Sequence, residues 1–256
     1  MKMNIGIFQY EMQDESPLEK IDRLAALLNE KPQLDLIVCP ELFISGYGSF
    51  EKIKEYSENR DGKYANKIAS LAKKTSTSII YEYPEMQDGL YNSAQIFDSK
   101  GISIANHRKK MLPPTADESK IFTPGKESSI LSINGIKIAI VICYELEFPE
   151  LIRELALQDV QLIIAPTGQS SNWPAAALHN CRTRAFENGI FVAYANSTGR
   201  LNDINFMGES KIIGPDGIDL VNAEQGEKLI CAEINTDDIL LVREKLPYLD
   251  DSKKLY

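Results

Sequence analysis

The sequence predicts an α/β protein in which helices and β-sheets form separate layers. Short runs rich in β-branched residues recur along the chain, as in strands that are buried on both faces. Longer segments between them show apolar residues every three or four positions, the pattern of amphipathic helices. Strands alternate with helices in the first third of the chain, hairpins follow, and the alternation then returns. This order is typical of a layered α/β fold.

The individual elements follow from the same periodicities. The segments with a strand pattern are, in chain order, Asn4–Gln9, Leu34–Cys39, Ser78–Tyr83, Asn92–Asp98, Ile102–Asn106, Ile130–Ile133, Lys137–Ile142, Leu162–Ala165, Phe191–Asn196, Ser210–Ile213, Ile218–Val221 and Lys228–Glu233. The segments with a helix pattern are Leu18–Asn29, Lys63–Lys74, Leu151–Leu157 and Ala175–Asn188. Pro149 suits the first turn of the third helix, because proline lacks only an N–H that has no partner there. Pro215-Asp-Gly217 predicts a tight hairpin turn.

The length and composition fit one globular domain. The 256 residues can form one large core, and 43% hydrophobic with 25% charged residues is an ordinary composition for a globular protein. The chain shows no linker or low-complexity tract, so we expect a single domain over residues 1–256. Its tail, from about Asp237, is a candidate for packing on a partner subunit.

Charge and apolar pattern narrow the partners and the compartment. A net charge of −9 argues against nucleic acid or an anionic membrane as the main partner. No apolar stretch approaches the ~20 residues that span a bilayer. The N-terminal residues enter a strand directly and lack the features of a signal peptide. We therefore expect a cytoplasmic protein.

Cysteines and histidines do not form metal-ligand patterns. The chain has four scattered cysteines without paired spacing, which we expect to be free thiols: Cys39, Cys143, Cys181 and Cys231. The two histidines, His107 and His179, lie outside any ligand-spaced cluster. We expect no metal and no cofactor.

Cys143 stands where a buried strand ends and a new element begins. It closes the apolar run Ile136-Lys-Ile-Ala-Ile-Val-Ile-Cys143, and the helix that starts near Pro149 follows soon after. A thiol on such a turn can be exposed at a sheet edge, near unpaired backbone N–H groups that hold an oxyanion. Taken alone, a cysteine in this position is more often a buried structural residue.

A carboxylate and a run of cations follow two other strands. Glu41 comes just past the strand that ends at Cys39, with apolar neighbours that would raise its pKa and make it a better base near neutral pH. Arg108, Lys109 and Lys110 also follow a strand and lead into a proline-rich loop, although cations in a row usually form a solvated face.

Thiol, carboxylate and ammonium together suffice for acyl transfer without histidine. The carboxylate takes the thiol proton, the thiolate attacks a carbonyl, and the cation balances the developing oxyanion. The same carboxylate can then activate water to hydrolyse the thioester.

Three segments carry these groups, and together they resemble the Glu-Lys-Cys motifs of the nitrilase superfamily of carbon–nitrogen hydrolases. The segments are Cys39-Pro-Glu41-Leu-Phe-Ile-Ser-Gly-Tyr47, Arg108-Lys109 with Leu112-Pro113, and Ile142-Cys143-Tyr-Glu-Leu-Glu-Phe-Pro-Glu150. They occur in the family's order at compatible separations, and the resemblance extends over nearly the whole chain.

The resemblance implies a four-layer αββα sandwich with its active site at one end of the two sheets, and a homodimer formed through helices near the nucleophile. By position, it makes Glu41 the general base, Lys109 the oxyanion-stabilising cation and Cys143 the nucleophile. The backbone N–H of Tyr144 would complete the oxyanion hole, and Glu118 is the candidate for a second carboxylate beside the lysine.

The assignment of the lysine depends on the register of this motif. A shift of one residue would put Lys110 in the place of Lys109, but the spacing to Leu112-Pro113 favours Lys109. Met111 departs from the family pattern, in which many members carry histidine two positions after that lysine.

The residues after the nucleophile bear on the substrate. Many members carry arginine or a neutral residue four positions after the cysteine, where this chain has Glu147, and Glu145 adds to the acidic character. This resembles a branch of amidases that includes 5-aminopentanamide hydrolases. A carboxylate near the pocket would pair with a substrate ammonium. The family's pocket-lining region corresponds to the loop that holds Gln169 and Trp173, which we expect to contact the substrate.

Several alternatives stay open at this stage. The same residues serve a nitrilase, a carbamoyl-amine hydrolase or a 2-oxo-acid ω-amidase. A Cys–His enzyme would use His179 as the base, and a catalytically silent member would act as a binding or assembly module. Glu147 could instead form a structural salt bridge or serve as a charge at a helix N-terminus, and Trp173 could anchor a core or a dimer interface. We expect an amidase that releases carboxylate and ammonia from a small, amino-group-bearing carboxamide.

Overall fold

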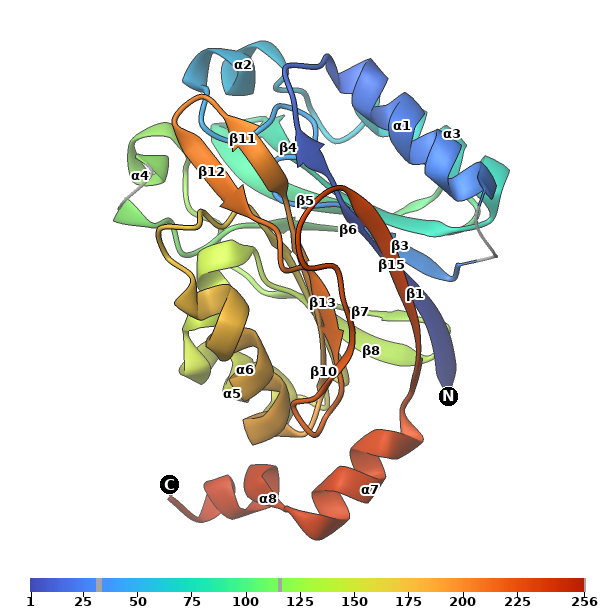
Figure 1. The fold of residues 1–256 in the computed structure, drawn as a ribbon, viewed down its shortest axis with the longest axis vertical. Helices are drawn as coiled ribbons and strands as arrows, with labels where there is room; N and C mark the ends of the chain where they lie inside the picture. Colours follow the sequence, from blue (N-terminus) through green and yellow to red (C-terminus); the bar gives the residue numbers. More distant parts are fainter. Residues whose placement is uncertain (31–33, 115–116, 256) are drawn as a thin grey trace.

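Two sheets lie face to face in the computed structural model, which describes residues 1–30, 34–114 and 117–255 (Figure 1). Within these residues each sheet has six strands. The first has the order β15 (Lys228–Asn235), β1 (Lys2–Gln9), β3 (Leu36–Val38), β4 (Ser78–Met86), β5 (Leu90–Phe97) and β6 (Ser103–Arg108). The second has the order β14 (Asp219–Asn222), β13 (Lys211–Ile213), β10 (Phe191–Asn196), β9 (Leu162–Thr167), β8 (Ile136–Ile140) and β7 (Ser129–Ile133).

Both sheets share one plan, with parallel strands in the middle and antiparallel strands at the edges. β1, β3 and β4 run parallel in the first sheet, and β8, β9 and β10 do so in the second. Their carboxyl ends point to the same end of the molecule, and loops that follow parallel strands are where α/β proteins place their sites.

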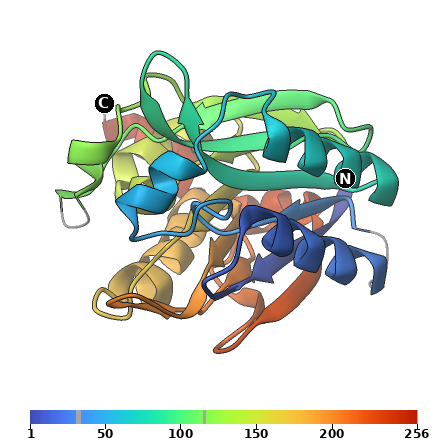
Figure 2. The same ribbon diagram turned by 90° about the horizontal axis from the view of Figure 1, so that it is seen from above.

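Helices cover the outer face of each sheet. α1 (Pro17–Glu30) and α3 (Lys63–Thr75) pack on the first sheet, and α5 (Pro149–Leu157) and α6 (Cys181–Asn188) pack on the second. Figure 1 shows the two helix pairs on opposite sides of the strands, and in the view from above α1 and α3 lie in front of them (Figure 2). This arrangement confirms the predicted αββα sandwich.

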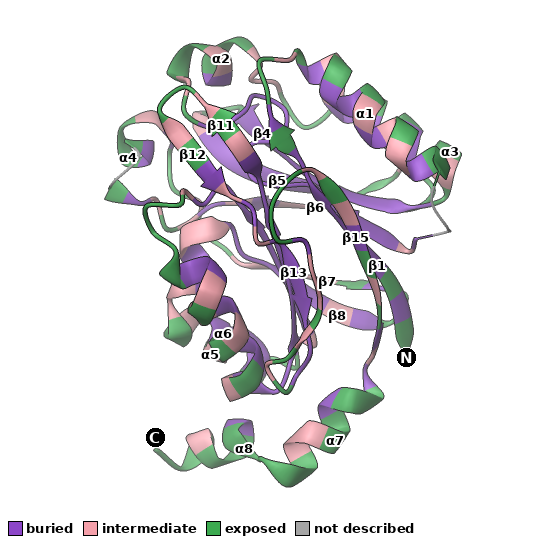
Figure 3. Cartoon of the chain, viewed as in Figure 1, coloured by how far each residue is buried: buried purple, intermediate pink, exposed green. Residues whose placement is uncertain are grey.

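The hydrophobic interior has three parts, one between the sheets and one under each helix layer. Ile5 and Ile7 of β1 meet Ile138 and Ile140 of β8 between the sheets, all of them fully buried. Purple strands in Figure 3 show how completely this layer is enclosed. Because both faces of each sheet are covered, the strands read as nearly continuous apolar runs. Each such side chain contributes about 1.5–3 kcal/mol by leaving water.

The predicted long elements are present, whereas several short ones escaped the sequence pattern. The strands expected over Leu34–Cys39 and Lys137–Ile142 end earlier, as β3 and β8, and their last residues enter loops. The helix expected over Ala175–Asn188 begins with a π-helical turn, η3 (Ala176–Asn180), before α6. The unexpected elements include β2 (Glu11–Met12), α2 (Phe50–Glu55), α4 (Glu118–Ile121), β11 (Thr198–Leu201), β12 (Ile204–Met207) and the helices of the C-terminal tail.

The C-terminal tail returns to the helices of its own chain. α7 (Asp237–Lys245) is largely exposed, with Leu240 at 68%, and α8 (Tyr248–Ser252) packs on α5 and α6 through the buried Leu249. Arg243 donates to the carbonyl oxygens of Asn188 and Gly189, each at 3.2 Å. η4 (Lys253–Leu255) ends the described chain. Packing of this tail on a partner subunit stays a prediction.

Across the described residues, we find no helix whose length and apolar character would let it cross a membrane.

Candidate functional site

Loops from both sheets meet at the carboxyl ends of the parallel strands. Glu41 follows β3 and Lys109 follows β6 in the first sheet, and Cys143 follows β8 and Gly168 follows β9 in the second. The Glu41 N–H donates to the carbonyl oxygen of Thr167 at 3.3 Å, which ties a loop of one sheet to a strand of the other. Residues distant in sequence are thereby brought to one place.

Lys109 lies between two carboxylates. Its Nζ is 2.7 Å from Glu41 Oε1 and 2.9 Å from Glu118 Oε1, and all three side chains are buried. Burial disfavours the ammonium, but the charges of Glu41 and Glu118 outweigh it and hold the pKa of Lys109 well above its usual value. Lys109 is therefore a permanent cation here. We call Glu41, Lys109, Glu118 and Cys143 the site cluster.

Two further groups fix the orientation of Glu41. The Asn92 side-chain amide donates to Oε1 at 2.9 Å, and the Gly168 N–H donates to Oε2 at 2.8 Å. A methyl group on Gly168 would lie 3.1 Å from Glu41 Oε2, so this carboxylate needs the glycine beside it. Charge-assisted hydrogen bonds of this kind hold a carboxylate firmly.

Cys143 begins a strained turn directly after the strand. The segment η2 (Cys143–Glu147) is a 3₁₀-helix, and the φ angle of Cys143 is +48°. A left-handed conformation at a residue with a side chain costs of order 1–3 kcal/mol and is typical of functional sites. The turn places Cys143 at the wall of a cavity.

The electrostatics of the site leave the Cys143 thiol protonated at rest. Burial raises its pKa well above the usual value, the charge of Glu41 raises it further, and Lys109 only partly opposes them. A thiolate therefore forms only if a base takes the proton. Glu41 is a neighbouring carboxylate that can do so.

Glu118 and Tyr47 complete the buried network. The Tyr47 hydroxyl donates to Glu118 Oε1 at 2.6 Å. Burial raises the pKa of Glu118, and Lys109 opposes this shift. Glu118 is the first residue of α4, and it follows shortly after residues 115 and 116, which lie outside the described residues. The structure thus brings Glu118 to the lysine, where the resemblance put it.

The sequence analysis gave no role to three groups that the structure places at the site: Asn92, Gly168 and Glu82. Glu82 lies on β4, fully buried, and its Oε2 accepts the N–H of Leu42 at 3.1 Å. Burial raises its pKa well above the usual value, so it is a neutral carboxyl behind Glu41. A charged residue inside an apolar strand was the available signal for Glu82.

The site cluster opens into a cavity of about 430 Å³. Tyr144, Gln169 and Trp173 line it, and Trp173 keeps 63% of its surface exposed, so it is not a core anchor. The lining residues are Tyr47, Pro113, Pro114, Cys143, Tyr144, Glu147, Gly168, Gln169, Ser170, Asn172, Trp173 and Ile204.

Glu147 is the one carboxylate among these lining residues. Its carboxyl oxygens have no hydrogen bond or ion pair among the residues that the structure describes, and burial raises its pKa. The alternative of a structural salt bridge is therefore not realised. An unpaired acidic group in a cavity can be satisfied by a cationic ligand.

Glu145 does not contact the cavity, which corrects the expectation that it binds substrate. Its carboxylate is fully buried and accepts hydrogen bonds from His107, Ile142 and Lys110. Alternate residues of a short 3₁₀ turn face different sides, so Glu147 reaches the cavity while Glu145 turns into the fold.

Two of the alternatives can be located in the structure. His179 lies in η3, and the described structure gives its side chain no carboxylate partner or place in the cavity lining. Lys110 donates its Nζ to Ser128, away from Glu41, so the register with Lys109 in the cluster holds. Among the described residues, no group of three or more His, Cys, Asp or Glu side chains is placed to hold a metal ion.

Comparison with known proteins agrees with this geometry. The family model described as carbon-nitrogen hydrolase matches residues 2–244. A hydrolase of Pseudomonas protegens, named for the pqqF 5′ region, is 34% identical over 98% of this chain and 89% of its own length. The 2-oxoglutaramate amidase of Bacillus subtilis is 30% identical over 99% of both chains.

Solved structures share the fold. Nit3 of Saccharomyces cerevisiae, a member of branch 10 of the nitrilase superfamily, superposes with a TM-score of 0.87 at 26% identity, over 96% of this chain and 94% of that one. With the family match spanning nearly the whole sequence, the chain belongs to the carbon-nitrogen hydrolase family and is a hydrolase of the amidase type, acting on carbon–nitrogen bonds other than peptide bonds.

Proposed function

We propose that this protein hydrolyses a small carboxamide through a thioester on Cys143. Glu41 accepts the thiol proton as the sulfur attacks the amide carbon. The oxygen that becomes negative is stabilised by the Lys109 ammonium and the Tyr144 backbone N–H. The carbon–nitrogen bond then breaks, Glu41 returns the proton to the leaving nitrogen, and ammonia departs.

The second half of the reaction reuses the same groups. Glu41 takes a proton from water, the hydroxide attacks the thioester carbonyl, and the carboxylate product leaves as the Cys143 thiol is restored. Glu118 keeps Lys109 in place beside Glu41, supported by the 2.9 Å contact to the ammonium. No cofactor takes part in this scheme.

We further propose that the substrate carries an ammonium group. The observation that supports this is the unpaired carboxylate of Glu147 on the cavity wall, in a lining that otherwise supplies apolar and neutral polar side chains and the Cys143 thiol. An ammonium in that position would gain a charge-assisted hydrogen bond, whereas a substrate carboxylate would be repelled. A linear amino amide such as 5-aminopentanamide meets this requirement.

An ω-amidase acting on 2-oxo acids is the second candidate, because a relative that is 30% identical to this chain carries the name 2-oxoglutaramate amidase. Its named substrate bears a carboxylate, so the two candidates differ in the sign of the charge that must lie near Glu147. This difference makes them separable by one substitution.

The test is ammonia release from a panel of 5-aminopentanamide, carbamoylputrescine, 2-oxoglutaramate, simple aliphatic amides and matched nitriles. We expect the cationic amide to have the highest kcat/KM, and Glu147→Gln to lower it about tenfold or more while changing neutral amides little. Cys143→Ala is the control for enzyme-dependent release.

A preference for 2-oxoglutaramate, with kcat/KM unchanged or raised in Glu147→Gln, would contradict the cationic substrate and support the ω-amidase activity. Preference for nitriles would replace it with a nitrilase. In either case the thioester scheme is tested by Cys143→Ala alone.

A further inference from the structure

One buried carboxylate outside the cavity joins the two chain segments that carry Cys143 and Lys109. Glu145 lies in η2 with no exposed surface, and its two oxygens bind different parts of the fold. Oε2 accepts the N–H of Ile142 at 2.7 Å, and Oε1 accepts the N–H of Lys110 at 2.8 Å. Ile142 directly precedes Cys143, and Lys110 directly follows Lys109.

His107 supplies the third hydrogen bond to this carboxylate. Its Nε2 lies 2.9 Å from Glu145 Oε2, and the ring is 1% exposed. Burial disfavours the charged form of Glu145, but His107 and the two peptide N–H groups outweigh it and lower the pKa. Glu145 is therefore ionised, and Nε2 of His107 carries the proton between them.

The turn that Glu145 binds is held from the other side by Arg184. Its guanidinium donates to the carbonyl oxygens of Leu146 at 3.1 Å and Glu147 at 2.7 Å. A strained φ such as that of Cys143 persists only where the surroundings fix it. Arg184 fixes η2 within the second sheet, whereas Glu145 reaches across to the strand end that carries the lysine.

We propose that Glu145 is a positioning residue for amide hydrolysis, which fixes the spacing between Cys143 and Lys109 by binding the backbone N–H of the residue next to each of them. The role rests on the proposed function, because it assumes that these two residues act on the same carbonyl group. A misplacement of about 1 Å between reacting groups can cost roughly a hundredfold in rate.

An amide cannot replace the carboxylate at this position. Glu145 accepts from three donors, but one end of a glutamine side chain only donates. The orientation that loses fewest bonds keeps the amide oxygen on Ile142 and His107 and turns the amide nitrogen toward the Lys110 N–H. Glu145→Gln is therefore expected to loosen the lysine while leaving the cysteine turn bonded.

The test compares Glu145→Gln with Glu58→Gln. Glu58 is a matched control because its carboxylate also accepts two backbone N–H groups, of Tyr64 at 2.9 Å and Ala65 at 2.7 Å, at the start of α3. We expect Glu145→Gln to lower kcat roughly a hundredfold with KM changed less than about threefold. Glu58→Gln should lower the melting temperature without changing kcat more than about twofold.

A second pair of variants covers the case in which Glu145→Gln does not fold. His107→Gln can keep a donor near Glu145 and should retain most of the activity, whereas His107→Leu removes it and should lower kcat about tenfold. KM should stay close to the wild-type value in both His107 variants, because His107 is not among the residues that line the cavity.

Equal kcat for the Glu145 and Glu58 variants, or for the two His107 variants where Glu145→Gln fails to fold, would overturn the positioning role. Failure of the proposed function has a different signature, because Cys143→Ala would then retain its activity. The two results are read from separate variants and cannot be confused.

Discussion

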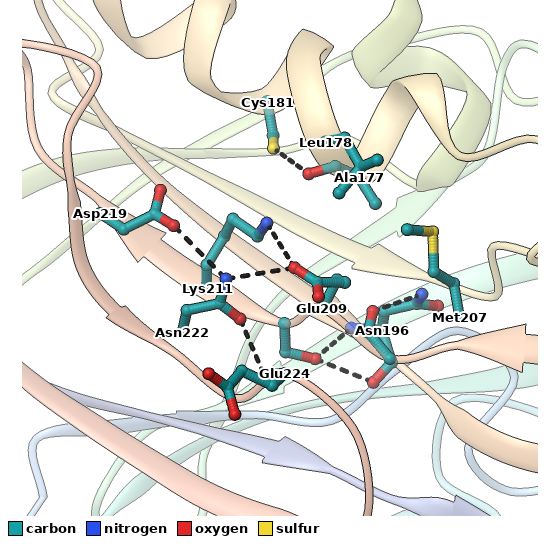
Figure 4. A network of polar contacts seen from close by, with 12 residues as sticks. Ala177, Leu178, Cys181, Asn196, Met207, Glu209, Lys211, Asp219, Asn222 and Glu224 are labelled. Carbon is teal, nitrogen blue, oxygen red and sulfur yellow. Dashed lines mark hydrogen bonds and ion pairs between the residues drawn. The ribbon is translucent and has the colours of Figure 1, made fainter.

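Among the residues that the structure describes, two groupings of cysteine, lysine and glutamate can be compared, and the site cluster contributes its Cys143 to the cavity described above. The second grouping is formed by Cys181, Lys211 and Glu209, between α6 and the strands β13 and β14 (Figure 4). Lys211 is fully buried like Lys109, and its Nζ lies 3.1 Å from Glu209. The residue types are the same, so the difference lies in how the chain presents them.

The two cysteines differ in backbone and in partner. Cys181 lies in regular helix, with φ −59°, and its Sγ donates to the carbonyl oxygen of Ala177 at 3.1 Å. Burial raises its pKa to about 11, and Lys211 and Arg182 only partly oppose this. A carbonyl oxygen cannot take up the proton, whereas Glu41 can. Cys143 instead stands in a strained turn at a cavity wall.

The comparison teaches that a thiol, an ammonium and a carboxylate do not make a site by being near one another. Glu209, in the loop between β12 and β13, is partly exposed to water and accepts a hydrogen bond from Asn222 of β14. Its ion pair with Lys211 of β13 therefore ties this loop to the two strands. In the site cluster both carboxylates are buried and converge on one ammonium beside the thiol. These side chains converge because they follow strands whose ends meet beside the cavity.

Replacing each cysteine in turn with alanine should give the largest difference between the two groupings. Cys143→Ala should lower kcat/KM for the best amide by roughly 10⁴-fold or more, because the nucleophile is lost. Cys181→Ala should leave kcat/KM within about twofold. Ammonia release measures both, and a loss of activity in the Cys181 variant at unchanged melting temperature would contradict the distinction.

Replacing each lysine in turn with methionine distinguishes a catalytic role from a structural one. Lys109→Met removes the cation that faces the developing oxyanion and should lower kcat about 10²–10³-fold. Lys211→Met should alter the melting temperature by only a few degrees, since Glu209 keeps its bond to Asn222, and should leave kcat within about twofold. Steady-state kinetics and thermal unfolding of both variants decide the matter.

The pH dependence of alkylation sharpens the difference between the thiols. In a Cys231→Ser background, iodoacetamide should modify Cys143 about a hundredfold faster than Cys181 at pH 8, because only Cys143 has a base and an open cavity. Both pKa values are raised, so a thiol without a base reacts faster as pH increases. Cys143 in a Glu41→Gln variant should therefore gain about tenfold in rate per pH unit up to pH 9, and the wild type should gain less.

Peptide mapping by mass spectrometry gives the rate at each cysteine. Equal pH slopes for the wild type and Glu41→Gln would show that Glu41 is not the base for this thiol.

Gly168→Ala should have the smallest of these effects. The added methyl group would lie 3.1 Å from Glu41 Oε2 and 3.3 Å from the Tyr47 ring, so the carboxylate must shift by a few tenths of an ångström. We expect kcat to fall about tenfold with little change in melting temperature. Gly226→Ala is a control for backbone strain, because its φ is +80° and nothing lies within 4 Å of an added methyl group. A full kcat for Gly168→Ala would mean that Glu41 is held less tightly than its contacts indicate.

Much of the fold could be predicted from the sequence, because long apolar runs and helical periodicity report burial directly. Phe191–Asn196 was predicted to the residue, and Pro149 was placed correctly in the first turn of α5. Short elements such as β2 and β11 were missed. β11 pairs with β12 and with β2, and β2 lies far from β11 in the sequence, so no local pattern reveals their pairing.

The site residues were less evenly predictable. Glu41, Lys109, Glu118 and Cys143 were named in advance by their motifs, and the structure brings them together. Glu145 was misplaced because sequence alone does not say which residues of a 3₁₀ turn face inward.

The central claim is that the amide is opened on Cys143 and not on any other thiol. Intact-protein mass spectrometry after rapid acid quench, with the panel amide of highest kcat/KM, tests it directly. We expect a mass increase equal to the substrate minus ammonia in the wild type and in Cys181→Ala, and none in Cys143→Ala. The same adduct on Cys143→Ala would contradict it.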